Sequence, residues 1–420
     1  MEPRRSSTPA IALGLAMFLP AFGTHGLNAA RASLASALHI DPGDGLRIGL
    51  VMAVFQLATI VPYLLVGAWG DRVGLRRGLL FGAALYAAAH LLLLICEPLS
   101  GFLALPAWLV FLSLRVVAGF GGGAITVTAN GLGAALYPPG QRGRSLSFVW
   151  LGVPLALVVG VPLPAFLART WADLPDGARR WLADPYATVA FVVALGVLVL
   201  VPAVVPVAPA RSAAGAAADR SVPSLQKTWS VLLTSLLMPF AVFELLASSA
   251  PHTQQAFGFT PAQQGVLFIL LGAGSVAGGV FSGALADRFG RRRCLLGSLI
   301  GFALLVPVLP GCGANAFRGV ATLLGFISTL RQGPFQALAS YFAGDGGRGR
   351  FSARILTASA LGIASGQFCG SFLVGRFGMG AVAWSSAAAT LLALACARPL
   401  REPVPVLVAA HPVEPAQPRR

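Results

Sequence analysis

The sequence predicts an all-α membrane protein with twelve transmembrane helices, arranged as two pseudo-symmetric bundles of six. Three observations support this fold class. First, 56% of the 420 residues are hydrophobic and only 10% are charged, whereas a typical soluble domain has about 25% charged residues. Second, the apolar residues form runs that are long enough to cross a bilayer. Third, one charged motif occurs twice, about half a chain apart.

Twelve apolar runs, bounded by Pro, Gly and charged residues, define the predicted spans. The first run follows Arg4 and Arg5 and could imitate a secretory signal. It has no clear cleavage site of small residues, so we expect it to remain as a helix. The twelve predicted spans are 11–34, 48–69, 78–95, 107–134, 146–167, 186–207, 228–250, 264–285, 294–312, 319–342, 355–374 and 379–397.

The stretch 208–227 separates six spans from six. It is rich in Ala, Arg and Ser and has no apolar periodicity, which is typical of a flexible linker. We therefore expect an N-terminal bundle at 1–207, a cytoplasmic linker at 208–227, a C-terminal bundle at 228–398 and a cytoplasmic tail at 399–420.

The positions of Lys and Arg predict the orientation, because cytoplasmic loops carry more of them. With the N-terminus inside, the inner segments hold 21 of the 30 Lys and Arg residues and the outer loops hold six. Both termini are thus expected in the cytoplasm, with the protein in the cytoplasmic (inner) membrane. The net charge of +16 does not indicate nucleic acid, because no basic stripe is interleaved with aromatic residues.

No cofactor, metal or disulfide is expected. The five cysteines are odd in number, scattered and mostly inside apolar runs, which fits small core residues better than a disulfide framework or a metal site. The spans contain no nucleophile–base set and no carboxylate pair, so we do not expect an enzyme. The phosphate-binding pattern G-x-x-x-x-G-K-[ST] is also missing from the sequence, which argues against ATP as the energy source.

The repeated motif is G-x-x-x-D-R-x-G-x-R-R, and its two copies lie 216 residues apart. One copy follows span 2 and the other follows span 8. Glycines at a helix end permit a tight turn and close helix contact, while arginines hold a loop at the cytoplasmic surface. The residues concerned are Gly67, Asp71, Arg72, Gly74 and Arg76 in the first copy, and Gly283, Asp287, Arg288, Gly290 and Arg292 in the second.

These two copies resemble the signature of the major facilitator superfamily, which occurs between spans 2 and 3 and again between spans 8 and 9. The span count and the central linker extend the resemblance over nearly the whole chain. The resemblance implies two six-helix bundles around a central cavity, and it implies that the motif is a gating latch that forms and breaks as the protein changes state. The alternative is that the motif only sets the topology, although topology alone does not require Asp71 and Asp287.

Spans 4 and 5 carry two weaker resemblances. Arg115, followed by a glycine-rich turn, is similar to the family's intramembrane-arginine motif, which is often linked to proton coupling. In span 5, Gly152, Gly160 and Pro162 are similar to the glycine-proline signature of efflux members. Ala165 and Phe166 stand where a glycine pair would complete that signature, and helix packing alone would also explain the glycines.

Four charged residues lie inside predicted spans: Arg31, Arg115, Glu244 and Arg331. Such residues usually face a cavity and have partners, because a charge inside a bilayer is costly. They fall on spans 1, 4, 7 and 10, which line the central cavity in the family that the chain resembles. Arg31 lies near the outer end of its span and can extend to the membrane surface.

Arg115 and Arg331 occupy equivalent positions, because they too are 216 residues apart; by the same offset, Glu244 corresponds to Asn28. We expect the two guanidinium groups to face each other near the midplane and to bind an anion between them. Glu244 is the best candidate for a proton carrier, with Arg115 as its partner in coupling. The predicted substrate-binding residues are Arg115, Arg331, Glu244, Asn28, Gln332 and Gln336. A structural alternative pairs Arg115 with Glu244 and binds Arg331 to helix carbonyls.

The sequence thus predicts a secondary active transporter that moves a small solute by alternating access, with proton coupling and a small anion as the expected substrate. The alternative substrate class is drugs, sugars or other amphiphilic molecules that are exported by proton-driven efflux. A receptor or scaffold on the same fold is a further alternative. The expected partners are a small-molecule substrate, protons and the lipid bilayer, and a monomer suffices for the mechanism.

Overall fold

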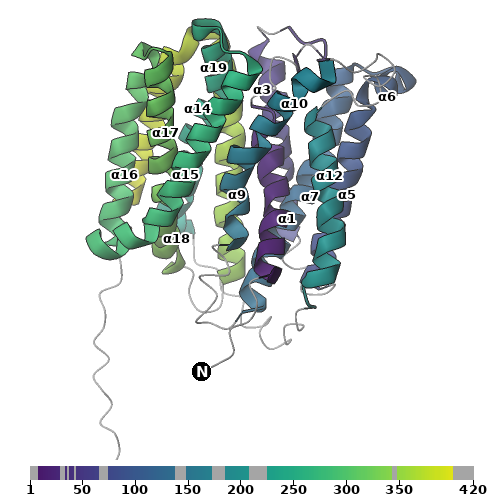
Figure 1. Cartoon of the computed structure of the whole chain (residues 1–420). Coiled ribbons are helices and arrows are strands. Elements are labelled where there is room, and N and C mark those ends of the chain that lie inside the picture. Colours follow the sequence, from purple (N-terminus) through teal and green to yellow (C-terminus); the bar gives the residue numbers. More distant parts are fainter. Residues whose placement is uncertain are drawn as a thin grey trace, which may run out of the picture.

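The computed structural model describes residues 8–28, 34–35, 37–41, 44–65, 74–137, 148–172, 185–207, 225–342 and 348–400. In this part of the chain the regular structure is helical, and the long helices run side by side along one axis (Figure 1). The colours of the figure separate into two groups. Purple to teal helices from the first half of the chain stand on one side, and green to yellow helices from the second half stand on the other.

Among the described residues, the first half contains six crossings and a short helix, α6, which lies near the edge of the molecule (Figure 1). Crossing 5 consists of two α-helical pieces joined by a π-helical turn, η2. The elements are α1 (Thr8–His25), α3 (Gly45–Ala58), α5 (Leu75–Leu94), α6 (Cys96–Leu103), α7 (Ala107–Ala135), α9 (Gly152–Leu155), η2 (Ala156–Gly160), α10 (Pro162–Ala172) and α12 (Pro185–Val204).

The second half repeats this order with fewer interruptions. A 3-10 turn, η3, extends α16, and α19 contains two crossings. The elements are α14 (Leu225–Phe257), α15 (Pro261–Phe289), α16 (Arg291–Leu305), η3 (Val306–Gly311), α17 (Ala314–Leu330), α18 (Gln332–Ser340) and α19 (Arg348–Ala397).

The chain crosses the membrane twelve times once one merged helix is divided and one broken helix is counted as a crossing. Within the described ranges, ten stretches are long and apolar enough to cross a membrane. One of them runs over 47 residues, Phe351–Ala397, and turns at Gly378, whose φ of 76° is not helical. The predicted span 319–342 is not one helix: it breaks at Arg331 into α17 and α18. The predicted twelve-helix membrane fold is therefore confirmed, and the expected bundle boundaries stay a prediction because 208–224 lies outside the described residues.

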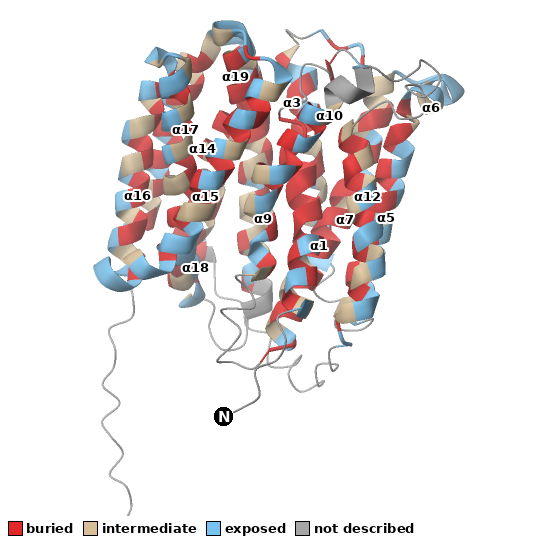
Figure 2. Cartoon of the chain, viewed as in Figure 1, coloured by how far each residue is buried: buried red, intermediate tan, exposed pale blue. Residues whose placement is uncertain are grey.

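Burial follows the two-bundle arrangement. Helix α1 is buried along almost its whole length, whereas the peripheral helices alternate buried and exposed faces (Figure 2). Exposed apolar side chains such as Leu64, Val199 and Trp384 are suited to lipid, because a helix satisfies its own backbone and only apolar atoms need face the hydrocarbon. The protein is thus a multi-pass membrane protein, and α1 is the most buried of its described spans.

Among the described residues, glycines allow close packing between the halves at two places. The start of α3 packs on α19, where a Cβ at Gly45 would lie 2.8 Å from the carbonyl oxygen of Ser371. Crossing 5 packs on α15, where a Cβ at Gly272 would lie 2.7 Å from Val158. Glycine permits such close approach of two helices. The contact between α3 and α19 lies at the end of the molecule where α1 ends.

Glycines of crossing 5 also bring it close to α1. A Cβ at Gly152 would overlap the carbonyl oxygen of Gly14, and a Cβ at Gly160 would lie 2.7 Å from the ring of Phe22. Pro162 begins α10 and contacts the region of Gly265 on α15. Crossing 5 is thus wedged between α1 of its own half and α15 of the other.

Replacing Gly152 with alanine should lower the free energy of unfolding by about 1–3 kcal/mol, because the methyl group must push α1 away from crossing 5. The midpoint of thermal unfolding in detergent measures this effect. Gly196→Ala is the matched control: Gly196 lies within α12 and has no heavy atom within 4 Å of the added methyl group. We expect its midpoint at or above that of the wild type. Equal midpoints for the two variants would contradict the close contact.

Candidate functional site

Polar side chains from both halves meet beside the end of α1. Thr24 Oγ1 donates to Gln56 Oε1 on α3 at 3.1 Å, and Gln56 Nε2 donates to Thr59 Oγ1 at 3.2 Å. From the other half, Gln367 Nε2 on α19 donates to the carbonyl oxygen of Thr24 at 2.9 Å. We call Thr24, His25, Asn28, Gln56 and Gln367 the interface cluster.

An aromatic contact also crosses between the halves. The ring of His25 on α1 stacks on Phe243 of α14, with ring centroids 4.9 Å apart and an interplanar angle of 22°. His25 is 4% exposed. Its stacking places an apolar ring beside the cluster and leaves the imidazole nitrogens for polar contacts.

Several polar atoms of the interface cluster have no hydrogen-bond partner among the described residues. They are both amide atoms of Asn28, Oε1 of Gln367 and Nδ1 of His25. Asn28 and Gln367 are 2% and 1% exposed. Buried polar groups are nearly always paired, so each unpaired one requires an explanation. A polar ligand bound between the halves would provide the missing partners.

Arg115 lies inside the first half. Its NH1 donates to the carbonyl oxygen of Gly23 at 2.7 Å and to the hydroxyl of Tyr186 at 2.8 Å. Its guanidinium carbon lies 4.7 Å from the ring centroid of Phe55, within the range of a cation–π contact. Arg115 therefore ties α7 to α1, α3 and α12.

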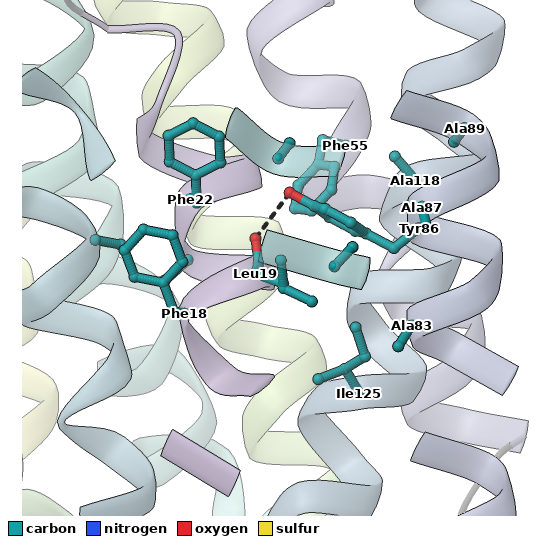
Figure 3. Packing of buried hydrophobic residues seen from close by; sticks show 14 of the residues in the cluster. Phe18, Leu19, Phe22, Phe55, Ala83, Tyr86, Ala87, Ala89, Ala118 and Ile125 are labelled. Carbon is teal, nitrogen blue, oxygen red and sulfur yellow. Dashed lines mark hydrogen bonds between the residues drawn. The ribbon is translucent and has the colours of Figure 1, made fainter. Parts of the chain in front are cut away.

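Aromatic side chains pack around the second half of α1. Figure 3 shows Phe18, Phe22 and Phe55 around Leu19, whose carbonyl oxygen accepts a hydrogen bond of 2.9 Å from Tyr86. The ring of Phe22 stacks on Tyr186 at 5.0 Å. These contacts tie the second half of α1 to α5 and α12.

Tyr186 extends the network to His90. The Nδ1 of His90 faces the carbonyl oxygen of Tyr86 at 2.8 Å, so this nitrogen carries the proton. The other ring nitrogen then accepts from the hydroxyl of Tyr186 at 3.3 Å. The hydroxyl of Tyr186 thus accepts from Arg115 and donates to His90.

Arg331 occupies the equivalent place in the second half. Its NH2 donates to the carbonyl oxygen of Met238 at 3.1 Å, next to Pro239 on α14, and its guanidinium carbon lies 4.8 Å from the ring of Phe302 on α16. Nε and NH1 have no partner in the described part of the chain. Each arginine is therefore bound to a carbonyl of the first long helix of its own half.

This geometry corrects one expectation. Arg115 and Arg331 do not meet across a shared chamber in this structure: both side chains are buried, and among the described residues their hydrogen bonds and ring contacts go to their own halves. Neither forms an ion pair with Glu244 within the described ranges. The contact of Arg331 with a helix carbonyl matches the structural alternative. Whether either arginine binds substrate stays a prediction.

Glu244 lies in the second half, fully buried between α14 and α19. Its Oε2 accepts a hydrogen bond of 2.8 Å from Ser386, and its Oε1 has no partner among the residues described. A Cβ at Gly370 would contact the backbone of Glu244, so α19 passes directly beside it. Glu244 follows Phe243, the ring that contacts His25.

The other predicted binding residues lie elsewhere. Gln332 and Gln336 are exposed on α18 and do not join the interface cluster. Arg31 is outside the described residues.

Within the described residues, no group of three or more His, Cys, Asp or Glu could hold a metal ion.

The repeated motif shows its symmetry in two pairs. Gly74 and Gly290 both adopt positive φ, 94° and 86°, immediately before α5 and α16. Arg76 donates to the carbonyl oxygen of Pro202 at 2.6 Å, and Arg292 donates to that of Arg398 at 2.9 Å. In each half, the motif arginine thus binds the end of the last crossing, where a cation also favours the helix dipole.

The remaining motif residues cannot be compared between copies. Gly67, Asp71 and Arg72 lie outside the described residues. Gly283, Asp287 and Arg288 are exposed at the end of α15. The gating role expected for both copies stays a prediction.

A family model for the Major Facilitator Superfamily matches residues 13–250 and 231–419, nearly the whole chain. The chain belongs to the Major Facilitator Superfamily. The family that the sequence resembles is therefore confirmed.

Two curated relatives are similar to this chain. One is the "Chloramphenicol resistance protein" of Streptomyces lividans, with 30% identity over 256 residues, 61% of this chain and 60% of that protein. Another is the "Inner membrane transport protein YdhP" of Escherichia coli (strain K12), with 23% identity over 282 residues and 66% of each chain. The matches thus span less than two thirds of these relatives. Membership of this superfamily agrees with the expectation that the chain is a transporter rather than an enzyme.

Two solved structures share the fold. The D-xylose-proton symporter aligns with a TM-score of 0.73 and 17% identity, over 94% of this chain and 97% of that one. The human organic anion transporter MFSD10 (TETRAN) aligns with a TM-score of 0.67 and 18% identity, over 94% of this chain and 100% of that one. At these identities the likeness confirms the fold, with its two helical bundles.

Sequence reasoning missed three residues of the site: Gln367, Tyr186 and Ser386. Gln367 is the sole amide side chain in the predicted span 355–374, and an amide in a span is costly unless it is hydrogen-bonded. That signal could have identified it. Tyr186 and Ser386 carry no comparable signal, because hydroxyl groups are common at helix contacts.

Replacing Tyr186 with phenylalanine should destabilise the fold by about 1–2 kcal/mol, because one hydroxyl serves both Arg115 and His90 in a buried place. Tyr341→Phe is the matched control, since it removes an exposed hydrogen bond to Arg291 and should change stability by less than about 0.5 kcal/mol. Thermal unfolding of both variants provides the comparison. A midpoint for Tyr186→Phe no lower than that for Tyr341→Phe would contradict the buried network.

Proposed function

We propose that this chain is a secondary active transporter that moves a small uncharged solute by alternating access and is driven by protons. The observation that carries the proposal is the interface cluster, where buried polar atoms without partners lie between two helical halves. In this superfamily a site at the interface of the repeats is reached from each side in turn as the halves rock.

The composition of the cluster supports an uncharged substrate. Its members offer hydroxyl, amide and imidazole groups. Thr24, Gln56, Asn28 and Gln367 carry no formal charge. The Asn28 amide can both donate and accept, and Gln367 Oε1 can accept. Hydroxyl or amide groups of a ligand would match these atoms, and the ring of Phe243 would contact an apolar part.

The competing substrate class is a small anion. Its support is that each arginine keeps two nitrogens without a partner in the described ranges, Nε and NH2 of Arg115 and Nε and NH1 of Arg331. Against it, both arginines contact carbonyl groups and rings inside their own halves rather than the interface cluster. We therefore favour the uncharged class, which corresponds to the drugs, sugars or amphiphiles of the efflux alternative.

Glu244 is the proposed proton carrier. It is a buried carboxyl beside the interface, with one oxygen bonded to Ser386 and the other without a partner among the described residues. Acidic residues inside membrane spans commonly serve as proton relays in transporters. Glu244 adjoins Phe243, so a change in its protonation would act next to the contact between the halves.

The contacts between the halves bear on the direction of transport and on the gates at the two ends of the molecule. The halves meet at the end where α1 ends, which the Lys and Arg distribution places outside the cell. This arrangement supports a state that is closed to the outside. The repeated motif would then gate the inner end, through Asp71 and Asp287. We propose export as the direction, on the basis of the relative that is named as a resistance protein.

Proteoliposomes with an imposed pH gradient test the substrate class. The probes are chloramphenicol and D-xylose as uncharged solutes and phosphate as an anion. We expect gradient-driven flux of an uncharged probe and none of phosphate. Asn28→Ala should raise the KM for that probe about tenfold, which is the loss expected for one or two hydrogen bonds. Asn315→Ala, at an exposed position, is the control. Flux of phosphate alone would refute the uncharged class.

Replacing Glu244 with glutamine should abolish accumulation driven by the pH gradient, because the amide cannot bind and release a proton. Exchange of labelled for unlabelled substrate at equal pH should continue, since the Ser386 contact can be kept by an amide oxygen. Glu97→Gln removes an exposed carboxyl on α6 and should leave both activities unchanged. Retained accumulation in Glu244→Gln would refute this role.

A further inference from the structure

Helix α1 ends in an unusual way beside the interface cluster. Its last intrahelical bond runs from the N–H of Gly26 to the carbonyl oxygen of Phe22, at 2.7 Å. The N–H of Asn28 then binds the carbonyl oxygen of His25 at 2.9 Å, rather than that of Thr24 four residues earlier. The carbonyl groups of Gly23 and Thr24 are therefore released from the helix and need other donors.

Side chains from different halves provide these donors. Arg115 of the first half binds the carbonyl oxygen of Gly23 at 2.7 Å. Gln367 of the second half binds that of Thr24 at 2.9 Å. Gln367 is 1% exposed, so water has no access to replace it. One end of α1 is thus fixed by its own half and by the other half at once.

The amide of Gln367 is held in place by the packing of α19. One residue earlier, Gly366 lies against the carbonyl oxygen of Phe240 on α14, and one residue later, Phe368 contacts α3 at Gly49. These contacts fix the position of the backbone on both sides of Gln367. Its hydrogen bond to Thr24 therefore depends on how the two halves are placed relative to each other.

We propose that Gln367 is a positioning residue that latches the two halves by capping the end of α1. When the halves separate at this end, the carbonyl group of Thr24 loses its donor. The nearest replacement is the N–H of Asn28, which would give up the carbonyl oxygen of His25 and extend α1. The amide of Asn28 would then move, so that closure at this end and the geometry of the interface cluster change together.

This inference rests on the proposed alternating access, because it needs a second placement of the halves. Distances between spin labels test it in the full chain. The labels are attached to p-acetylphenylalanine at Phe102 on α6 and Val308 on η3, which are 85% and 50% exposed in different halves. This chemistry leaves the five native cysteines in place.

We expect Gln367→Leu to shift the ratio of the longer to the shorter distance about fivefold, as the loss of one hydrogen bond predicts. Gln264→Leu is the matched control: it also removes a buried glutamine whose amide donates to a helix carbonyl, that of Ala250 at 3.1 Å, but this bond lies within the second half. Its ratio should stay within about twofold of the wild type. If Gln367→Leu does not fold, Gln367→Met removes the same donor with an unbranched side chain.

An unchanged ratio in the Gln367 variants would overturn the latch, and so would an equal shift in Gln264→Leu. A single distance in every variant, with and without a pH gradient, would also overturn it, because no second state would exist to be held. Flux measured in proteoliposomes tests the transport proposal separately. Flux with an unchanged distance ratio in Gln367→Leu would refute the latch alone, whereas absence of flux with a shifted ratio would refute transport alone.

Discussion

The carbonyl groups released at the end of α1 must find donors inside the protein, because no water reaches them in the membrane interior. This requirement determines much of the structure around the interface. Arg115 meets it from the first half and Gln367 from the second. The same turn carries Thr24, His25 and Asn28, so the groups that cap the helix also place the side chains of the candidate site.

The internal duplication separates what holds each half together from what makes the site. Contacts within a half are repeated: Arg76 and Arg292 bind the end of a last crossing, and Arg115 and Arg331 bind a carbonyl of a first crossing. At the interface the helix pairs are repeated, since α3 and the first part of α19 correspond to α15 and crossing 5, but the polar side-chain contacts differ. Glu244 corresponds to Asn28, and the counterpart of Gln367 is Leu151 or Val161, depending on which of the offsets between the halves applies. The candidate site thus lies where the two copies have diverged.

The sequence predicted the elements whose signals are local or periodic. Length and hydropathy located the crossings, and the two copies of the glycine–arginine motif located equivalent turns, with Gly74 and Gly290 both at positive φ. The same offset paired Arg115 with Arg331. The offset did not predict where the two arginine side chains point. An offset relates two positions by symmetry, but it leaves open the rotation of each helix about its own axis. Packing of Phe55, Tyr186 and Phe302 around the guanidinium groups decides that rotation.

The sequence by itself therefore determined a twelve-crossing membrane protein of this superfamily, since bilayer thickness and backbone hydrogen bonding leave few alternatives for such apolar runs. Only the tertiary structure decided that the arginines are internal ties and that neutral side chains meet between the halves. The contact of Gln367 with Thr24 joins residues 343 positions apart. Such a contact follows from how complete helices pack, and no local pattern in the chain encodes it.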